Sequence, residues 1–227
     1  MGQSAKEKRL DPFRNREEAG KRLADRLSTL SLESPVLLAI PRGGVLVALP
    51  VARKLRLPLG LVPIRRLPVN WAKDIEIGYT TDTGELHLNQ ALIGQLRITR
   101  QQIYQLARKE QKALQQELDS WGARRPASLA EQTTVIVDEG LHSGWTMFSA
   151  VETVRKLGAK KIIVATPVSH FRAQRFVGRH CDQFVSLITV DDPLFHIADF
   201  YEQFPDVGDE QIRSAIAASS SSSETAA

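Results

Sequence analysis

The sequence predicts an α/β protein built on a mainly parallel, twisted sheet flanked by helices. Short apolar runs of strand length alternate with longer runs whose apolar residues recur with the helical period. The 227 residues are 42% hydrophobic and 25% charged, which is ordinary for a globular domain. Glycine-containing turns directly follow two of the apolar runs, at the edge where parallel sheets bind ligands.

Strands and helices are expected to alternate along the chain. Asn15 can cap a first helix, whose apolar face would carry Ala19, Leu23, Ala24 and Leu27. Residues 75–80 and 85–88 alternate around Asp82, Thr83 and Gly84, which predicts a hairpin. Strands are expected over residues 36–40, 59–64, 134–138, 161–167 and 183–190, and helices over 45–55, 99–121, 145–157 and a short stretch after Ser169. Right-handed crossovers between these strands give the parallel sheet.

One domain is expected over residues 13–217. Residues 1–12 and the serine-rich tail 218–227 are predicted to be disordered. Cys181 is the single cysteine, so no internal disulfide can form, which fits a reducing compartment. No apolar run approaches the roughly 20 residues that span a bilayer, and the polar N-terminus lacks a secretory signal. We therefore expect a cytoplasmic protein without a membrane partner.

Positive charge gathers in one part of the sequence. The formal net charge is +4, and arginines and lysines cluster between Arg42 and Lys73. Such a cluster suits a nucleic acid or a phosphorylated small molecule, or it is an ordinary solvated surface. No helix-turn-helix or RNA-binding signature accompanies the cluster, which disfavours a nucleic-acid partner.

The segment from Thr134 to Thr146 carries the strongest chemical signal. An apolar run ends in two acids, Asp138 and Glu139, and a helix is expected to begin after the next loop, which contains Gly140, Leu141, His142, Ser143, Gly144, Trp145 and Thr146. Free N–H groups at a helix start attract phosphate, and glycines let a ligand approach the backbone. The acids would repel that phosphate, so they are expected to face neutral hydroxyls or a metal. The alternative is a helix cap at Ser143 with solvated acids, but a cap explains only one hydroxyl.

Familiar nucleotide and hydrolase motifs do not fit this segment. The spacing between Gly140 and Gly144 is one residue short of the phosphate-binding loop of nucleoside triphosphatases, and no lysine follows it. The dinucleotide-binding glycine pattern and the nucleophile-elbow serine are also absent from the sequence.

The motifs together resemble the type I phosphoribosyltransferase family. An apolar strand, two acids and a Ser-Gly-x-Thr loop are similar to the family's signature for 5-phosphoribosyl-1-pyrophosphate (PRPP). The run Ile40-Pro41-Arg42-Gly43-Gly44-Val45 resembles the pyrophosphate loop, and Ile64-Arg65-Arg66-Leu67 resembles the strand entering the mobile loop. The stretch from Phe195 to Glu210 is similar to the ending of bacterial members of unassigned substrate. The likeness covers residues 13–216 and implies a small hood formed by the N- and C-terminal segments.

The resemblance implies a role for each motif. Asp138 and Glu139 would contact the ribose hydroxyls, directly or through Mg²⁺-bound water, and residues 140–146 would wrap the 5-phosphate. The pyrophosphate loop, with a non-proline cis peptide in many members, would act through Arg42, Gly43 and Gly44. The next two arginines, Arg65 and Arg66, are either further pyrophosphate ligands or a solvated strand end.

Two residues depart from the family's usual pattern. His142 would touch a phosphate or, more simply, be a solvated loop histidine. The large ring of Trp145 could narrow the pocket, although only its backbone N–H is needed there.

The implied reaction moves the ribose-5-phosphate group of PRPP to a nitrogen base and releases pyrophosphate. Mg²⁺ and Arg42 would stabilise the leaving group, and residues 68–74 could close over the site to exclude water. The helix over 99–121 is expected to be scaffold or a dimer surface with its charges paired along the helix, and homodimers are common in the family. Phe195 and Tyr201 would stack on the acceptor base or pack in the core.

Two other functions compete with the transferase. One is a regulator that binds PRPP or a nucleotide and uses the basic surface for nucleic acid, with little or no catalysis. The other is a phosphohydrolase acting on a phosphorylated sugar, for which the sequence offers no dedicated nucleophile. The acceptor base itself is not specified by the sequence.

Overall fold

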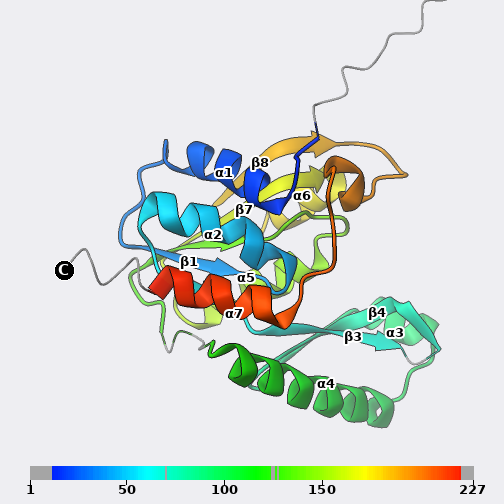
Figure 1. Cartoon of the computed structure of the whole chain (residues 1–227). Coiled ribbons are helices and arrows are strands. Elements are labelled where there is room, and N and C mark those ends of the chain that lie inside the picture. The colour runs from blue at the N-terminus through cyan, green and yellow to red at the C-terminus, as the bar shows by residue number, and fades with distance from the viewer. Residues whose placement is uncertain (1–11, 70, 124–125, 127, 221–227) are drawn as a thin grey trace, which may run out of the picture.

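The protein is built on a five-stranded sheet with the predicted alternation of strands and helices (Figure 1). The computed structural model describes residues 12–69, 71–123, 126 and 128–220, so the predicted disorder of residues 1–11 lies outside the described range. Every neighbouring pair in the sheet is parallel. The strand order is β2 (Leu59–Leu61), β1 (Pro35–Ala39), β6 (Thr133–Val137), β7 (Lys161–His170) and β8 (Gln183–Val190). The predicted α/β class is confirmed.

Helices cover both faces of this sheet. Residues of α1 (Arg16–Leu27), α2 (Gly43–Leu55) and α7 (Asp209–Ser220) share one buried cluster with alternate strand residues such as Leu37 and Val135. The other face packs on α5 (Trp145–Lys156) and α6 (Phe171–Val177) through residues such as Ile136. Asn15 caps α1 as predicted, accepting a hydrogen bond from the Glu18 N–H at 3.0 Å. Within the described ranges, no helix is both long and apolar enough to cross a membrane.

A second, antiparallel sheet stands apart from the first, at the lower right of Figure 1. It contains β3 (Ile64–Val69), β4 (Ala72–Thr81) and β5 (Leu86–Leu88), with α3 (Gln90–Gln95) and α4 (Arg100–Trp121) packed beside it. These elements share their own buried cluster, which includes Leu67, Ile77 and Ile103. We call this unit the hairpin lobe. The predicted hairpin is confirmed, because Tyr79 pairs with His87 across β4 and β5.

The predicted strand over residues 59–64 is wrong in its extent. The structure ends β2 at Leu61 and begins β3 at Ile64, and the two strands belong to different sheets. Pro63 lies between them and has no N–H to donate to a ladder. The chain therefore leaves the central sheet here and enters the hairpin lobe.

The N- and C-terminal segments meet beside the sheet, as the predicted hood requires. The Phe13 N–H donates to the Phe200 carbonyl and the Glu202 N–H donates to the Phe13 carbonyl, both at 2.8 Å. Phe13 is buried in one cluster with Phe195 and Tyr201. Both of these aromatic residues therefore pack in the core, which was one of their two predicted roles.

The prediction that the disordered tail begins at residue 218 is wrong, because α7 continues to Ser220. The apolar residues Ile212 and Ala215 of this helix are buried against the sheet. The Ser219 hydroxyl is also buried, donates to the Ile216 carbonyl at 2.8 Å and accepts from the Leu59 N–H at 3.4 Å. Serines that resemble a low-complexity tail thus form the last turn of a packed helix. Residues 221–227 lie outside the described range.

Candidate functional site

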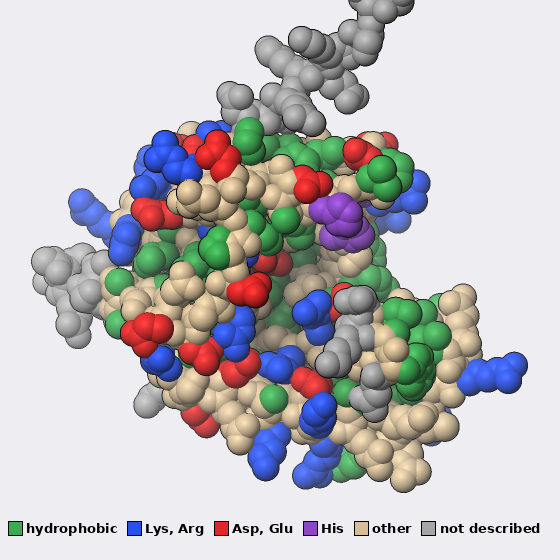
Figure 2. All heavy atoms as spheres, turned by 45° about the vertical axis from the view of Figure 1, so that its right-hand side comes forward, with side chains coloured by type: hydrophobic (Ala, Val, Ile, Leu, Met, Phe, Trp, Pro, Cys, Tyr) green, Lys and Arg blue, Asp and Glu red, His purple; other side chains and the backbone are tan. Residues whose placement is uncertain are grey.

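The two glycine-containing loops that follow β1 and β6 open into one cleft of about 1090 Å³. The cleft lies between the carboxyl edge of the central sheet and the hairpin lobe, and Figure 2 shows a hollow ringed by acidic and basic side chains. Of the predicted site residues, only Gly44 and Trp145 do not line it. Those that do are Arg42, Gly43, Arg65, Arg66, Asp138, Glu139, Gly140, Leu141, His142, Ser143, Gly144 and Thr146.

The two loops pack directly against each other. A β-carbon on Gly43 would overlap the carboxylate of Glu139, and one on Gly44 would lie 2.8 Å from the Val137 carbonyl oxygen. Only glycine fits at either position without a shift of the neighbouring loop. The peptide bond between Pro41 and Arg42 is cis, as the family resemblance implies. The predicted pyrophosphate loop thus lies against the predicted ribose-binding acids.

Asp138 and Glu139 form the floor of the cleft, where β6 ends. The Asp138 carboxylate accepts a hydrogen bond from the Glu139 N–H at 2.8 Å. Burial, followed by the neighbouring charge of Glu139, raises the pKa of Asp138 well above its ordinary value. An anionic Asp138 is therefore disfavoured unless a hydrogen-bond donor or a cation reaches it.

Arg16 completes this floor and was not predicted from the sequence. Its guanidinium forms an ion pair with Glu139, donates to the Pro205 carbonyl at 2.7 Å and lies 3.8 Å from the centre of the Phe204 ring. Arg16 is in the first turn of α1, where the helix dipole disfavours a cation. This unfavourable position of Arg16 is the one local feature of the sequence that indicates a partner outside the helix.

The loop from residue 140 to residue 146 turns into α5 through Gly144. This glycine has a φ of 82°, in the left-handed region that other residues rarely adopt, and it is the N-cap residue. Ser143 is exposed at the rim, and its hydroxyl accepts only a long hydrogen bond of 3.4 Å from the Trp145 N–H. Helix capping by Ser143 is therefore weak, and the residue lines the cleft.

Neither His142 nor Trp145, the two residues that differ from the family's usual pattern, blocks the cleft. The Trp145 ring packs on Phe148 and Phe176, with centroid distances of 5.6 and 5.3 Å, and the residue does not line the cleft. His142 is exposed at the cleft rim and stacks on Phe195, with ring centroids 5.9 Å apart. The predicted narrowing by the indole ring does not occur.

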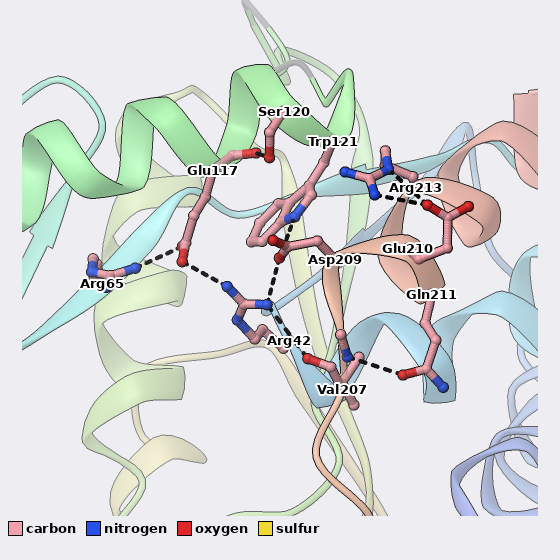
Figure 3. Close-up of polar contacts among 11 residues, drawn as sticks. Arg42, Arg65, Glu117, Ser120, Trp121, Val207, Asp209, Glu210, Gln211 and Arg213 are labelled. Carbon is pink, nitrogen blue, oxygen red and sulfur yellow. Dashed lines mark hydrogen bonds and ion pairs between the residues drawn. The ribbon is translucent and has the colours of Figure 1, made fainter.

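Two arginines of the cleft, Arg42 and Arg65, are paired with carboxylates of α4 and α7 (Figure 3). Glu117 lies 2.7 Å from Arg42 and 2.6 Å from Arg65, and Asp209 lies 2.6 Å from Arg42. Burial acts to lower the pKa of Arg42, but its two carboxylate partners raise it above its ordinary value. Both Arg42 and Arg65 are therefore fixed in their charged form.

The charges of α4 were predicted to pair with one another along the surface of that helix. This prediction is wrong for two of its acids, Glu110 and Glu117. Glu110 is buried and pairs with Arg65 at 2.7 Å, and Glu117 points into the same cleft. Arg66 is more exposed and lies 3.7 Å from Glu76. Neither acid has a basic residue three or four positions away along α4, and the fold supplies Arg42 and Arg65 from other elements instead.

The residues that the structure describes do not form a metal cage from side chains alone. Among the described residues, no group of three or more His, Cys, Asp or Glu side chains is arranged to hold a metal ion. The available donors are Asp138 and Glu139, and the second is already paired with Arg16. Mg²⁺ commonly binds one or two carboxylates and takes its other ligands from water and substrate phosphates, so this pair fits such an ion only together with a ligand.

Comparison with known proteins identifies relatives of this chain. Two Mycobacterium tuberculosis proteins, from strains CDC 1551 and H37Rv and each named "Putative phosphoribosyl transferase", are 31% identical to it over 202 residues. The match covers 88% of this chain and 45% of each relative, so the chain spans about half the length of these curated relatives. The crystal structure of TT1426 from Thermus thermophilus superposes with a TM-score of 0.74 at 29% identity, covering 90% of this chain and 97% of that one.

A sequence profile describes the family directly. The phosphoribosyl transferase domain matches residues 80–202, which is more than half of the 227 residues. This range includes β6, the acidic pair and the loop that leads into α5. The chain therefore belongs to the phosphoribosyl transferase family.

Proposed function

We propose that this protein is a phosphoribosyltransferase that moves the ribose-5-phosphate group of PRPP to a nitrogen base and releases pyrophosphate. One observation carries the proposal: the loops at Gly43 and at Glu139 pack against each other within a single cleft. PRPP carries a monophosphate at one end and a diphosphate at the other, with the ribose hydroxyls between them. The loop leading into α5 would bind the monophosphate, the acidic floor would bind the ribose hydroxyls, and the Arg42 loop would bind the diphosphate.

Binding of the sugar follows from the groups on the floor. The carboxylates of Asp138 and Glu139 would accept hydrogen bonds from the ribose hydroxyls. The raised pKa of Asp138 favours this arrangement, because a hydroxyl donor supplies the partner that the buried carboxylate needs. The N–H groups at the start of α5 and the hydroxyl of Ser143 would donate to the 5-phosphate.

The reaction breaks the bond between C1 of the ribose and the pyrophosphate oxygen. The bonding electrons leave with pyrophosphate, the lone pair of the base nitrogen forms the new bond to C1, and the proton of that nitrogen passes to pyrophosphate or to water. Arg42 and Arg65 would stabilise the negative charge that develops on the leaving oxygens. Mg²⁺, when bound with the substrate, would neutralise further charge on the diphosphate, with Asp138 and Glu139 reached through its water ligands.

The hairpin lobe forms the wall of the cleft opposite the central sheet. Its residues Arg66, Glu76 and Tyr79 line the cleft, and residues 68–74, for which closure was predicted, include the end of β3 and the start of β4. Exclusion of water there would protect the electron-poor C1 from hydrolysis.

The test is an assay of pyrophosphate release from PRPP and Mg²⁺ with a panel of purine, pyrimidine and related bases. Release that depends on one base and is lost in Asp138→Asn supports the proposal. PRPP binding without pyrophosphate release on any base contradicts a transferase and favours a PRPP-binding regulator. Glu33→Gln is the control, because Glu33 is exposed and does not line the cleft.

A further inference from the structure

One carboxylate holds two arginines of the cleft at once. Glu117 presents one oxygen to Arg42 at 2.7 Å and the other to Arg65 at 2.6 Å. In Figure 3 the Glu117 side chain extends from α4, and its carboxylate lies between the guanidinium groups of Arg42 and Arg65. The Glu117 side chain is 24% exposed, so this bridge is partly shielded from water.

Two guanidinium groups around one anion form a binding geometry for phosphate as well as for carboxylate. Under the proposed function these arginines serve the diphosphate end of the ligand. We infer that Glu117 is an internal competitor which occupies the anion position between Arg42 and Arg65, and which the diphosphate must displace. This inference rests on the proposed function and adds a specificity-determining residue to it.

The remaining partners of the arginines explain why Glu117 is the group that exchanges. When Glu117 leaves, Arg42 keeps its ion pair with Asp209 at 2.6 Å, and Arg65 keeps Glu110 at 2.7 Å. Each guanidinium thus remains oriented while the edge that faced Glu117 becomes free for the ligand. Displacing either of the other two carboxylates would free only one arginine.

Asp209 is itself held in place. Its carboxylate accepts a hydrogen bond from Trp121 Nε1 at 2.9 Å, and the Arg42 guanidinium lies 5.2 Å from the centre of that indole ring. Trp121 is buried at the end of α4, one turn after Glu117. The contacts among Arg42, Asp209 and Trp121 therefore keep Arg42 in position when the diphosphate displaces Glu117.

The competitor affects one end of the ligand only. The ion pairs of Glu117 go to Arg42 and Arg65, which lie outside the loop from residue 140 to residue 146 where the 5-phosphate would bind. Its presence therefore reduces the apparent affinity for a diphosphate and leaves that for a sugar monophosphate unchanged, because only the first must displace it. A change in affinity for the diphosphate alone would therefore distinguish competition by Glu117 from a general structural role of this residue.

The experiment measures binding of inorganic pyrophosphate and of ribose 5-phosphate by calorimetry to the wild type, Glu117→Gln and Glu33→Gln. The amide of glutamine keeps the shape of the side chain and removes its charge. We expect Glu117→Gln to bind pyrophosphate about tenfold more tightly, since two partly exposed ion pairs no longer oppose the ligand. Its affinity for ribose 5-phosphate should equal that of the wild type. Glu33→Gln removes the same charge at an exposed position and should change neither affinity.

Unchanged or weaker pyrophosphate binding by Glu117→Gln would overturn the inference, because Glu117 would then support the arginines rather than compete. An equal gain in affinity for ribose 5-phosphate would also overturn it, since the effect would be general electrostatics. If Glu117→Gln unfolds, Glu117→Asp withdraws the carboxylate by one methylene and should give a smaller gain in the same direction. No gain with the folded aspartate variant would overturn the inference as well.

These binding measurements do not depend on turnover. Tighter pyrophosphate binding by Glu117→Gln supports the inference even if the wild type releases no pyrophosphate from PRPP with any base, in which case the proposed function alone fails. Base-dependent turnover by the wild type without the expected gain in binding removes the inference and leaves the proposed function standing.

Discussion

The phenol oxygen of Tyr79 lies 2.8 Å from the hydroxyl oxygen of Thr146, and this contact joins the hairpin lobe to the first turn of α5. Tyr79 also donates to the carboxylate of Glu76 at 2.9 Å, so its single proton is engaged there and Thr146 is the donor to Tyr79. Burial, followed by the charge of Glu76, raises the pKa of Tyr79 above its ordinary value, so the phenol stays protonated. The loop predicted to hold the 5-phosphate is therefore connected to the opposite wall of the cleft.

Replacing Tyr79 with Phe should lower the free energy of unfolding by about 1–2 kcal/mol, because a buried hydroxyl with two partners is lost. Urea denaturation followed by circular dichroism measures the change. Tyr104→Phe is the matched control: Tyr104 is 59% exposed and its hydroxyl accepts a hydrogen bond from Arg108 on the same helix, so loss of that hydroxyl should cost less than about 0.5 kcal/mol. Equal costs for the two variants would show that the Tyr79 contacts contribute nothing beyond an exposed hydroxyl.

Asp138→Asn should stabilise the fold at neutral pH while weakening binding of PRPP. The pKa of Asp138 is raised in the folded protein, whereas in the unfolded chain it is about 3.9. As the pH rises above about 4, the unfolded chain loses its proton first, so the wild type loses stability and the asparagine variant does not.

The measurement for this variant is the thermal midpoint from pH 4 to pH 8. The midpoints of Asp138→Asn and the wild type should nearly coincide at pH 4 and diverge as the pH rises, with the variant higher. The hydrogen bond from the Glu139 N–H survives because the amide oxygen accepts it equally well. A constant difference across the range would mean that ionisation of Asp138 does not affect stability.

Arg16→Met should destabilise the protein by about 2 kcal/mol, since it leaves the Glu139 carboxylate partly buried without its ion-pair partner. This cost is smaller than that for a fully buried pair because the Glu139 side chain is 23% exposed. Chemical denaturation of Arg16→Met, Glu139→Gln and the double variant forms a double-mutant cycle. Strict additivity of the two single costs would show that the pair is not coupled.

Gly43→Ala should force the two loops apart. Its β-carbon would overlap the Glu139 carboxylate, so we expect a loss of about 1–3 kcal/mol of stability and a marked loss of PRPP affinity. Gly94→Ala is the control, because a β-carbon there meets nothing within 4 Å and the residue lies inside α3. That change should be neutral or stabilising by up to about 1 kcal/mol. Normal PRPP binding by Gly43→Ala would place the diphosphate away from this loop.

Local patterns in the sequence were sufficient to predict the central sheet and the position of both loops. Continuous apolar runs ending in glycine turns predicted β1 and β6, and the parallel arrangement then required that Arg42 and Ser143 share one edge. The structure places both residues in one cleft. The hairpin of the lobe followed from alternation around Gly84, since strand period and turn composition are both local.

The polar contacts across the cleft could not be predicted in the same way. Glu110 and Glu117 have no basic residue three or four positions away on their own helix, and helical spacing cannot show that partners lie 45 and 75 residues away. The same holds for Arg16, whose partner Glu139 is 123 residues further on. The break at Pro63 was missed because an apolar run on both sides of a proline reads as one strand. Such features depend on how elements pack, which periodicity does not encode.

The long sequence separation of the Arg16 contacts has a consequence for biosynthesis. Arg16 reaches the Pro205 carbonyl, 189 residues away, and this contact is one of those that hold the C-terminal segment at the floor of the cleft, together with the hydrogen bond from Tyr201 to the Glu139 carbonyl. During translation the chain emerges from its N-terminus, so the strands can pair while residue 205 is still within the ribosome. A nascent chain thus lacks a finished pocket until the segment around residue 205 has left the ribosome.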